Sequence, residues 1–367
     1  MDLYSLIDQM YRQRMVQRVT DNPQAQFGTE TRTYLGANLL PERNVPENAF
    51  VEDAIRYRTV IANSGTRYSP SQKKGEGLIT GAFTVVLGES DIAREFTSRD
   101  YDALLTVLSS GQSMQAMVTM LRWVDTVINR ALVELNEAQR WNAICGASVV
   151  RKGDNGYTET VAYSNPAGHR TAAGGQWSLD TYDPYEDLLG KQQMLSDKGY
   201  TVNRIIMDRA SMNKLLRNAN VVGRLNNVVV TTGAGGGQPL ETRSRGRVTQ
   251  ADLNQMLAAD GLPPLETYDL TYNDEAGTKR FFPANTCAMI STTGRDESIL
   301  VGEQLDLIEN TLGYTAIGRP AGQSKSGRVV RMEAFDNKPP RVEAEGWQTA
   351  LPVITEPEAI AIISGIS

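Results

Sequence analysis

The chain has very little histidine and cysteine for its 367 residues, which limits the chemistry it can perform. His169 is the only histidine, so a Ser-His-Asp relay or a histidine-rich metal site would depend on one residue in a Gly/Ala/Ser-rich loop. Cys145 and Cys287 stand far apart with no other cysteine near either, which favours two reduced thiols over a disulfide framework. We therefore expect no catalytic residues, no metal and no cofactor.

Basic clusters and long apolar runs are also missing. The 37 Lys and Arg residues are outnumbered by 43 Asp and Glu residues, giving a formal net charge of −6, and no basic block could follow a phosphate backbone. Tight direct binding to DNA is therefore not expected. Asp2, Asp8, Arg12 and Arg14 interrupt the N-terminal apolar residues, and no stretch approaches the roughly 18 apolar residues of a membrane span. We expect neither secretion by a signal peptide nor a transmembrane segment.

Composition and length predict a folded protein with a substantial core. The hydrophobic fraction of 40% and the charged fraction of 22% are typical of soluble globular chains. A chain of this size buries roughly 75% of its unfolded surface, enough for one large or two ordinary domains.

The first 90 residues read as segments that lack a core of their own. Leu3, Ile7, Met10 and Val16 predict a short amphipathic helix over residues 2–19, and Asn22-Pro23 ends it. Residues 24–46 are polar and interrupted by Gly and Pro, so we expect an extended arm that gains its apolar burial only by lying on neighbouring copies. Residues 50–62 and 78–87 then predict a long hairpin. Because an isolated two-stranded ribbon is marginally stable in water, the hairpin should lean on a neighbour.

Periodicity then predicts a long helix followed by a layered region of strands and helices. Apolar residues recur on one face from residue 112 to residue 145, a helix of about 50 Å at 1.5 Å per residue, after a shorter helix over residues 101–108. Asp183, Pro184 and Glu186 indicate an N-cap, a first-turn proline and a capping-box acid for a helix ending near Gly199. The other predicted elements are a strand over residues 202–207, a helix from Asp208 through Leu216 or Leu225, a helix from Thr249 to near Gly261, a strand over residues 265–272, a hairpin turn at residues 273–277, and strands over residues 286–290, 341–354 and 359–363.

Three motifs allow a chemical interpretation. The glycine cluster at residues 233–237 could be a phosphate loop, but no Gly-Lys-Ser/Thr follows it and Gln238 breaks the dinucleotide spacing, which favours a flexible loop. Asp180, Asp183, Glu186 and Asp187 could bind a divalent cation, although helix capping already explains two of them. Lys73 and Lys74 could pair with or crosslink to a neighbouring subunit, or be solvated lysines with no partner.

The order of these parts resembles a known family. Five short stretches carry the resemblance: Trp177-Ser178 with Thr181-Tyr182-Asp183-Pro184, Ile205-Ile206-Met207-Asp208, the run from Lys279 to Thr286, Leu351-Pro352, and Glu356-Pro357-Glu358. Over nearly the whole chain their order and spacing resemble the lambda-like phage major capsid proteins, the capsid protein E family with the Hong Kong 97-type fold.

The resemblance implies an α+β fold with four parts. These are an N-terminal arm (1–48), an extended hairpin loop (49–90), a peripheral domain with a long spine helix (91–182 and 333–355) and an axial domain (183–332 and 356–367). Contacts between subunits would involve Tyr68, Pro70, Lys73 and Lys74 at the hairpin tip, and Gly235, Gly236 and Arg243 in the loop near the capsomer centre.

The resemblance also implies a function and partners. The chain would assemble with itself into hexamers and pentamers of an icosahedral tailed-phage head around double-stranded DNA, without binding that DNA specifically and without a membrane. Further partners would be a portal protein, a scaffold protein and a decoration or cement protein, with assembly in the host cytoplasm and residence in the virion. The alternatives are an encapsulin-type nanocompartment shell of the same fold and a nucleotide-binding enzyme that uses the Gly233 loop.

Overall fold

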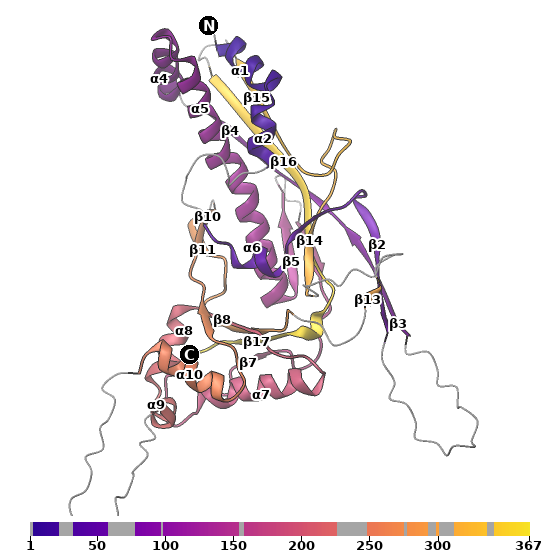
Figure 1. Ribbon diagram of the computed structural model, residues 1–367, viewed down its shortest axis with the longest axis vertical. Coiled ribbons are helices and arrows are strands. Elements are labelled where there is room, and N and C mark those ends of the chain that lie inside the picture. Colours follow the sequence, from indigo (N-terminus) through magenta and orange to yellow (C-terminus); the bar gives the residue numbers. More distant parts are fainter. Residues whose placement is uncertain are drawn as a thin grey trace, which may run out of the picture. The chain divides into compact units, whose positions relative to one another are not determined.

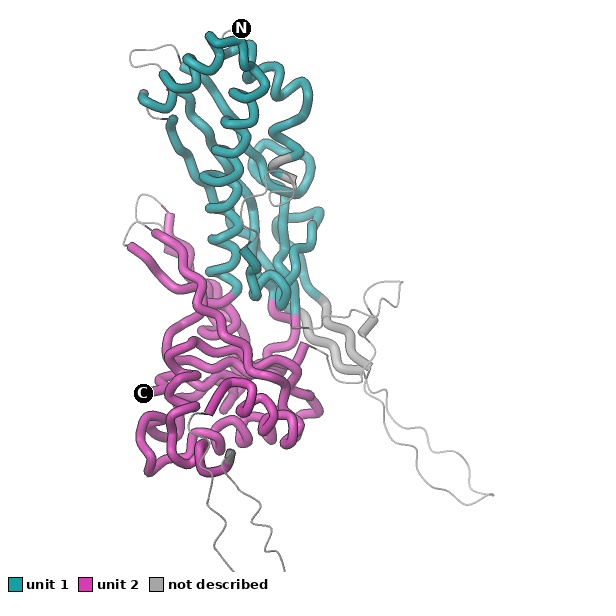
Figure 2. Tube along the Cα trace, turned by 60° about the vertical axis from the view of Figure 1, so that its left-hand side comes forward, with its two compact units in different colours: residues 1–54, 80–140, 313–353 teal, residues 55–79, 141–312, 354–367 magenta. Residues whose placement is uncertain are grey.

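The computed structural model describes residues 3–21, 32–57, 78–96, 98–153, 158–225, 248–274, 277–292, 299–300, 312–335 and 341–367. The chain forms two compact units: unit 1 is residues 1–54, 80–140 and 313–353, and unit 2 is residues 55–79, 141–312 and 354–367 (Figure 2). Both contain helices and strands, which confirms the α+β class. Residues 313–332 belong to unit 1, whereas the sequence analysis assigned them to the axial domain. The boundaries of the four predicted parts stay a prediction.

Unit 1 contains a helical layer and a five-stranded sheet (Figure 1). The sheet order is β1-β14-β16-β15, and β4 also pairs with β16 in antiparallel register. The helices are α1 Leu3–Arg12, α2 Met15–Asp21, α3 Leu35–Leu39, α4 Ser98–Ser109, α5 Ser113–Val124 and the start of α6 Arg130–Gly146. The strands are β1 Glu42–Asn44, β4 Gly88–Glu95, β14 Gly313–Ile317, β15 Arg328–Phe335 and β16 Arg341–Ile354.

The N-terminal helices are part of the unit 1 core. The predicted single helix is two, because Arg14 takes a left-handed backbone conformation (φ 54°) between α1 and α2. Leu6 and Met10 are fully buried among apolar residues of α4, α5, β15 and β16. Burial of a large apolar side chain contributes roughly 1.5–3 kcal/mol. These helices therefore complete their own subunit, and the expectation that the arm lacks burial without neighbours is wrong for them.

The predicted long helix is confirmed, with an irregularity at its middle. A π-helical turn, Asp125–Asn129, joins α5 to α6 without ending the helix. The adjacent strand β16 has Gly346 at this level, and a Cβ on Gly346 would overlap Cγ2 of Ile128 from the π turn. The glycine therefore lets the bulged helix lie close to the sheet.

The predicted hairpin is present where the structure describes it. Its strands are β2 Ala49–Tyr57 and β3 Leu78–Val86, and β13 Ile299–Leu300 pairs with β2 in antiparallel register. Strand β4 follows β3 directly and was not predicted. The predicted strand segment 58–62 and the hairpin tip lie outside the described residues.

Unit 2 contains a mixed sheet in the order β7-β17-β12-β8-β9, packed with helices (Figure 1). The sheet strands are β7 Arg170–Ala172, β8 Arg204–Met207, β9 Leu265–Thr267, β12 Cys287–Ile290 and β17 Ile360–Ser364. Two hairpins accompany it, β5 Ser148–Lys152 with β6 Thr158–Ala162, and β10 Thr271–Asp274 with β11 Gly277–Arg280. The helices are α7 Pro184–Asp197, α8 Arg209–Arg217, α9 Ala219–Leu225 and α10 Gln250–Ala259.

Local sequence signals set the ends of the unit 2 helices. Asp183 and Asp208 accept hydrogen bonds from backbone N–H groups of α7 and α8, and Thr249 with Asp252 forms a reciprocal capping box on α10. Gly199 closes α7 with a positive φ of 82°. One predicted cap is wrong: the Glu186 carboxylate binds Arg224 and does not complete a capping box with Asp183.

The predicted strand over residues 265–272 is also different in the structure. It is interrupted and forms β9 and β10, which belong to different sheets. The interruption lets Tyr268 pack on Trp141, whose ring also meets Phe282 edge-on at 5.0 Å between centroids. Within the described residues, no helix combines the length and the apolar character needed to cross a lipid bilayer.

Candidate functional site

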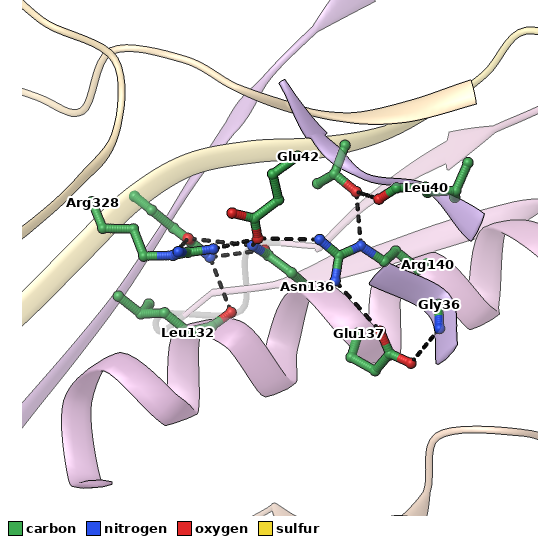
Figure 3. Close-up of polar contacts among 10 residues, drawn as sticks. Gly36, Leu40, Glu42, Leu132, Asn136, Glu137, Arg140 and Arg328 are labelled. Atoms are coloured by element: carbon green, nitrogen blue, oxygen red, sulfur yellow. Dashed lines mark hydrogen bonds and ion pairs between the residues drawn. The ribbon is translucent and has the colours of Figure 1, made fainter. Parts of the chain in front are cut away.

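A buried polar network joins the arm residues 32–45 to helix α6 and to the sheet of unit 1 (Figure 3). Arg140 of α6 is at its centre, with a side chain only 1% exposed. Its guanidinium donates to Thr315 Oγ1 at 2.8 Å, Glu42 Oε1 at 3.1 Å and Glu137 Oε2 at 3.4 Å. A buried charge is strongly destabilising unless it is paired and hydrogen-bonded, and two carboxylates fulfil that condition here.

Glu42 connects the arm strand β1 to two arginines. Its Oε1 accepts from Arg140 and from Arg328 of β15. Burial alone would raise the pKa of Glu42, but the two guanidiniums outweigh burial and lower it. The carboxylate is therefore ionised at neutral pH and bridges the arm, the helix and the sheet.

The amide side chains of Gln348 and Asn136 extend the polar network from the ion pairs along α6 and β16. Gln348 of β16 is fully buried and donates to Asn136 Oδ1 at 2.8 Å and to the Leu132 carbonyl at 3.2 Å. Its own oxygen accepts from Arg328 Nε at 2.9 Å. Each of these amides is thereby satisfied, and one polar cluster fixes α6 against β16 and β15.

The backbone of the arm also makes hydrogen bonds to other parts of unit 1. The Gly36 amide donates to Glu137 Oε1 at 2.8 Å, and a Cβ on Gly36 would stand 2.7 Å from Glu137 Oε2. Thr315 Oγ1 donates to the Leu40 carbonyl at 2.9 Å, and β1 pairs in parallel with β14. The expectation that the arm, residues 24–46, depends on neighbouring copies is therefore wrong for its described residues 32–46, which are bound to their own unit by a short helix, a strand and charged groups.

The hairpin has an anchored base in unit 1. Asn48, next to the start of β2, donates to the Arg319 carbonyl at 2.8 Å and accepts from the Arg319 amide at 2.7 Å. Its carbonyl also accepts from the Leu87 amide, after the end of β3, at 2.8 Å. On β2, Glu52 Oε2 also accepts from Tyr314 Oη of β14 at 2.7 Å, so the base of the hairpin is held at two positions.

The strands above this base expose apolar side chains. Val51 on β2 is 58% exposed, and Phe83 and Val86 on β3 are 38% and 54% exposed. Phe83 and Val86 are three residues apart on one strand and therefore point to opposite faces of the ribbon, so both faces carry an exposed apolar side chain. The polar network around Arg140 binds the arm to its own unit, whereas the base of the hairpin leaves apolar side chains exposed to solvent.

The predicted contact residues lie outside the described part of the chain. This holds for all seven: Tyr68, Pro70, Lys73, Lys74, Gly235, Gly236 and Arg243. It holds also for the Gly233 loop on which a nucleotide site would depend.

The four carboxylates considered for a cation have protein partners. Arg224 binds Asp183 and Glu186, and Asp180 accepts from the Ala219 amide. Asp187 accepts from Trp177 Nε1 at 2.8 Å and from Tyr182 Oη at 2.5 Å. Among the residues that the structure describes, no group of three or more His, Cys, Asp and Glu side chains could hold a metal ion. These carboxylates act in capping and packing.

The cysteines lack the environment of a reactive thiol. Both are free, and burial raises the pKa of Cys145 to about 12 and that of Cys287 further. Thiolates, and not thiols, are the nucleophiles and metal ligands, so the buried Cys287 and the half-buried Cys145 act as small packing groups.

The charged network was missed by the sequence analysis. Glu137 and Arg140 stand three residues apart in a helix, a spacing that predicts an ordinary surface ion pair. The available signal was their place beside Ala138 and Trp141, on the helical face predicted to be buried.

Comparison with known proteins identifies the family. A model of the family described as phage major capsid protein E matches residues 29–364. The fold is similar to that of a proposed prophage capsid protein from Escherichia coli CFT073, with 13% identity, a TM-score of 0.57 and coverage of 98% of each chain. It is also similar to a phage-related protein from Bordetella bronchiseptica RB50, with 12% identity, a TM-score of 0.50 and coverage of 92% of this chain and 93% of that one. Curated protein sequences give no match.

The family match and the structural likeness agree with each other. The fold is of the Hong Kong 97 type, as the resemblance in sequence implied. The family consists of structural subunits that assemble into shells, which is not an enzyme class. Because its model spans most of the sequence, the chain belongs to the phage major capsid protein E family.

Proposed function

We propose that this chain builds the hexamers and pentamers of an icosahedral tailed-phage head by laying its hairpin, residues 49–90, across a neighbouring copy. The observation that carries the proposal is the hairpin base, where Val51, Phe83 and Val86 are exposed on strands anchored at Asn48. Burying apolar surface contributes roughly 25 cal/mol per Å², and a neighbouring subunit would supply the missing cover. Repeated around a symmetric ring, modest contacts of this kind can close a shell.

The arm has a different role in this proposal. Its described residues are bound within unit 1 through Glu42, Glu137 and Arg140, so it braces the subunit from which the hairpin extends. Assembly then depends on the hairpin, and subunit stability depends on the arm.

The remaining partners follow from the role of a head protein. The head would enclose double-stranded DNA without specific binding, in keeping with a net charge of −6. A portal protein, a scaffold protein and a decoration or cement protein would complete it, with assembly in the host cytoplasm. Tyr68, Pro70, Lys73 and Lys74 would contact the neighbouring copy, and Gly235, Gly236 and Arg243 would lie near the capsomer centre.

Deleting residues 64–77 tests the role of the hairpin. We expect the deleted chain to remain soluble and folded, with a melting temperature close to that of the intact chain, but to form no closed particles in negative-stain images. The matched control replaces residues 64–77 with Gly and Ser at equal length, which separates loss of length from loss of side chains. Closed particles from the deleted chain would refute the proposal, and intact-chain particles filled with enzyme in place of DNA would indicate a nanocompartment.

A further inference from the structure

His169 is fully buried in unit 2, and assembly gives no reason for an ionisable group there. It lies directly before β7, and its carbonyl accepts from the Ile362 amide of β17 at 2.7 Å. Strands β7 and β17 pair in parallel, with Ile362 opposite Arg170. The imidazole therefore sits where the last strand of the chain joins the sheet.

The hydrogen bonds of the ring define its protonation state. Nδ1 lies 2.8 Å from the Ile360 carbonyl oxygen, which can only accept, so Nδ1 carries the proton. Nε2 lies 2.8 Å from Lys198 Nζ, an ammonium that can only donate. The ring nitrogen facing the lysine must therefore offer a lone pair, and this geometry requires a neutral histidine.

The charged groups around the ring carry an excess of positive charge. Lys198 Nζ also binds Glu358 Oε1 at 3.1 Å, and Lys191 Nζ donates to the Gly168 carbonyl at 2.6 Å. On the side of β7, the Arg170 guanidinium is directed to the Ile144 carbonyl and to Asn165. Burial lowers the pKa of His169, the Ile360 carbonyl and Glu358 act against this, and Lys198 and Lys191 add to it.

The same contacts join three segments of unit 2. Lys198 is the C-terminal cap of α7, and Glu358 belongs to the 3-10 turn Pro357–Ala359 that leads into β17. His169 connects both to β7. If Nε2 became protonated, two N–H donors would face each other at hydrogen-bond distance, with Glu358 as the acceptor that the lysine already uses.

We propose that His169, Lys198 and Glu358 form a proton-sensitive latch, which holds the end of α7 to the start of β17 while His169 is neutral and opens when His169 binds a proton. The unfolded chain has an ordinary histidine pKa of about 6.5, above that of the folded chain. As pH falls below about 6.5, the unfolded state therefore binds more protons than the folded state. The stability that the latch contributes is present above that pH and is lost as pH falls toward the lower folded pKa.

Exchange of the imidazole carbon-bound hydrogen for deuterium, measured by mass spectrometry, tests the latch directly. The chain has a single histidine, so the signal needs no assignment, and the method applies to subunits and particles alike. We expect a titration midpoint below that of a free histidine peptide, and a higher midpoint in Lys198→Met. The control Lys152→Met removes an exposed lysine and should leave the midpoint unchanged. A midpoint equal to that of the peptide, or one unmoved by Lys198→Met, would overturn the proposal.

Stability as a function of pH provides the second measurement. The variant His169→Gln keeps an acceptor for Lys198 but cannot bind a proton in this range. Between pH 7.5 and 5.5 we expect the melting temperature of the intact chain to fall by roughly 1–2 °C more than that of His169→Gln. Amide exchange in β17 should become faster in the intact chain over the same interval. Parallel melting curves would contradict the latch, and if His169→Gln fails to fold, the exchange midpoint of Lys198→Met still decides. Neither readout depends on whether particles form.

Discussion

The arm and the hairpin base follow one another in the sequence and are stabilised in different ways. Arm residues 32–45 are bound to their own subunit by a buried network in which Arg140, Glu137 and Glu42 satisfy one another (Figure 3). The hairpin base is held at Asn48 and by a hydrogen bond from Tyr314 to Glu52, yet it exposes Val51 and Val86. Polar composition alone therefore does not identify a segment that needs a partner, because a polar segment can be satisfied within its own subunit by charged groups of a helix.

Arg140→Met should produce the largest effect on stability. It would leave Glu137, which is fully buried, without its arginine, and breaking one side of a buried pair costs about 3–5 kcal/mol. Urea denaturation of the purified chain measures this change in the free energy of unfolding. The control Arg12→Met removes a pair with Asp8 in which both side chains are well exposed, and it should change stability by about 0.5 kcal/mol or less. Equal effects of the two variants would show that the network does not hold the arm.

Gly346→Ala should have the next largest effect, because the new methyl group would overlap Ile128 of the π turn. Overpacking of this kind costs about 1–3 kcal/mol. Ile128→Ala makes room for the methyl group, so the double variant should lose less stability than the sum of the two single losses. Gly190→Ala, on a helix position with open space around it, should be neutral or stabilising by up to about 1 kcal/mol. Additive losses at 346 and 128 would mean that the glycine does not accommodate the bulged helix.

Features with a short-range cause could be predicted from the sequence. Asp183, Asp208 and Thr249 mark helix starts by capping backbone N–H groups, and the structure confirms all three. The strand over residues 341–354 is found with the predicted bounds, because its alternating pattern continues into a long apolar run. Periodicity likewise predicted the long helix, but a π turn inside a helix has no distinct pattern.

Features that depend on distant residues could not be predicted. Strand β14 is only five residues long and fully buried, so it carries no alternation. Strand β15 does alternate, with Val330 and Met332 buried, and its signal was overlooked. The network around Arg140 combines residues nearly 290 positions apart, from Glu42 to Arg328, and no local pattern indicates that they meet.

The assembly of the double variant Val51→Ser/Val86→Ser tests the central claim most directly. The two valines are exposed in the subunit, so the variant should melt within about 1 °C of the intact chain, since exposed substitutions usually change stability by less than about 0.5 kcal/mol. Val150→Ser, at a valine 48% exposed on β5, is the matched control. Analytical ultracentrifugation should show that the double variant remains as free subunits or capsomers, while the control forms closed particles like the intact chain. Normal particle yield from the double variant would contradict the account.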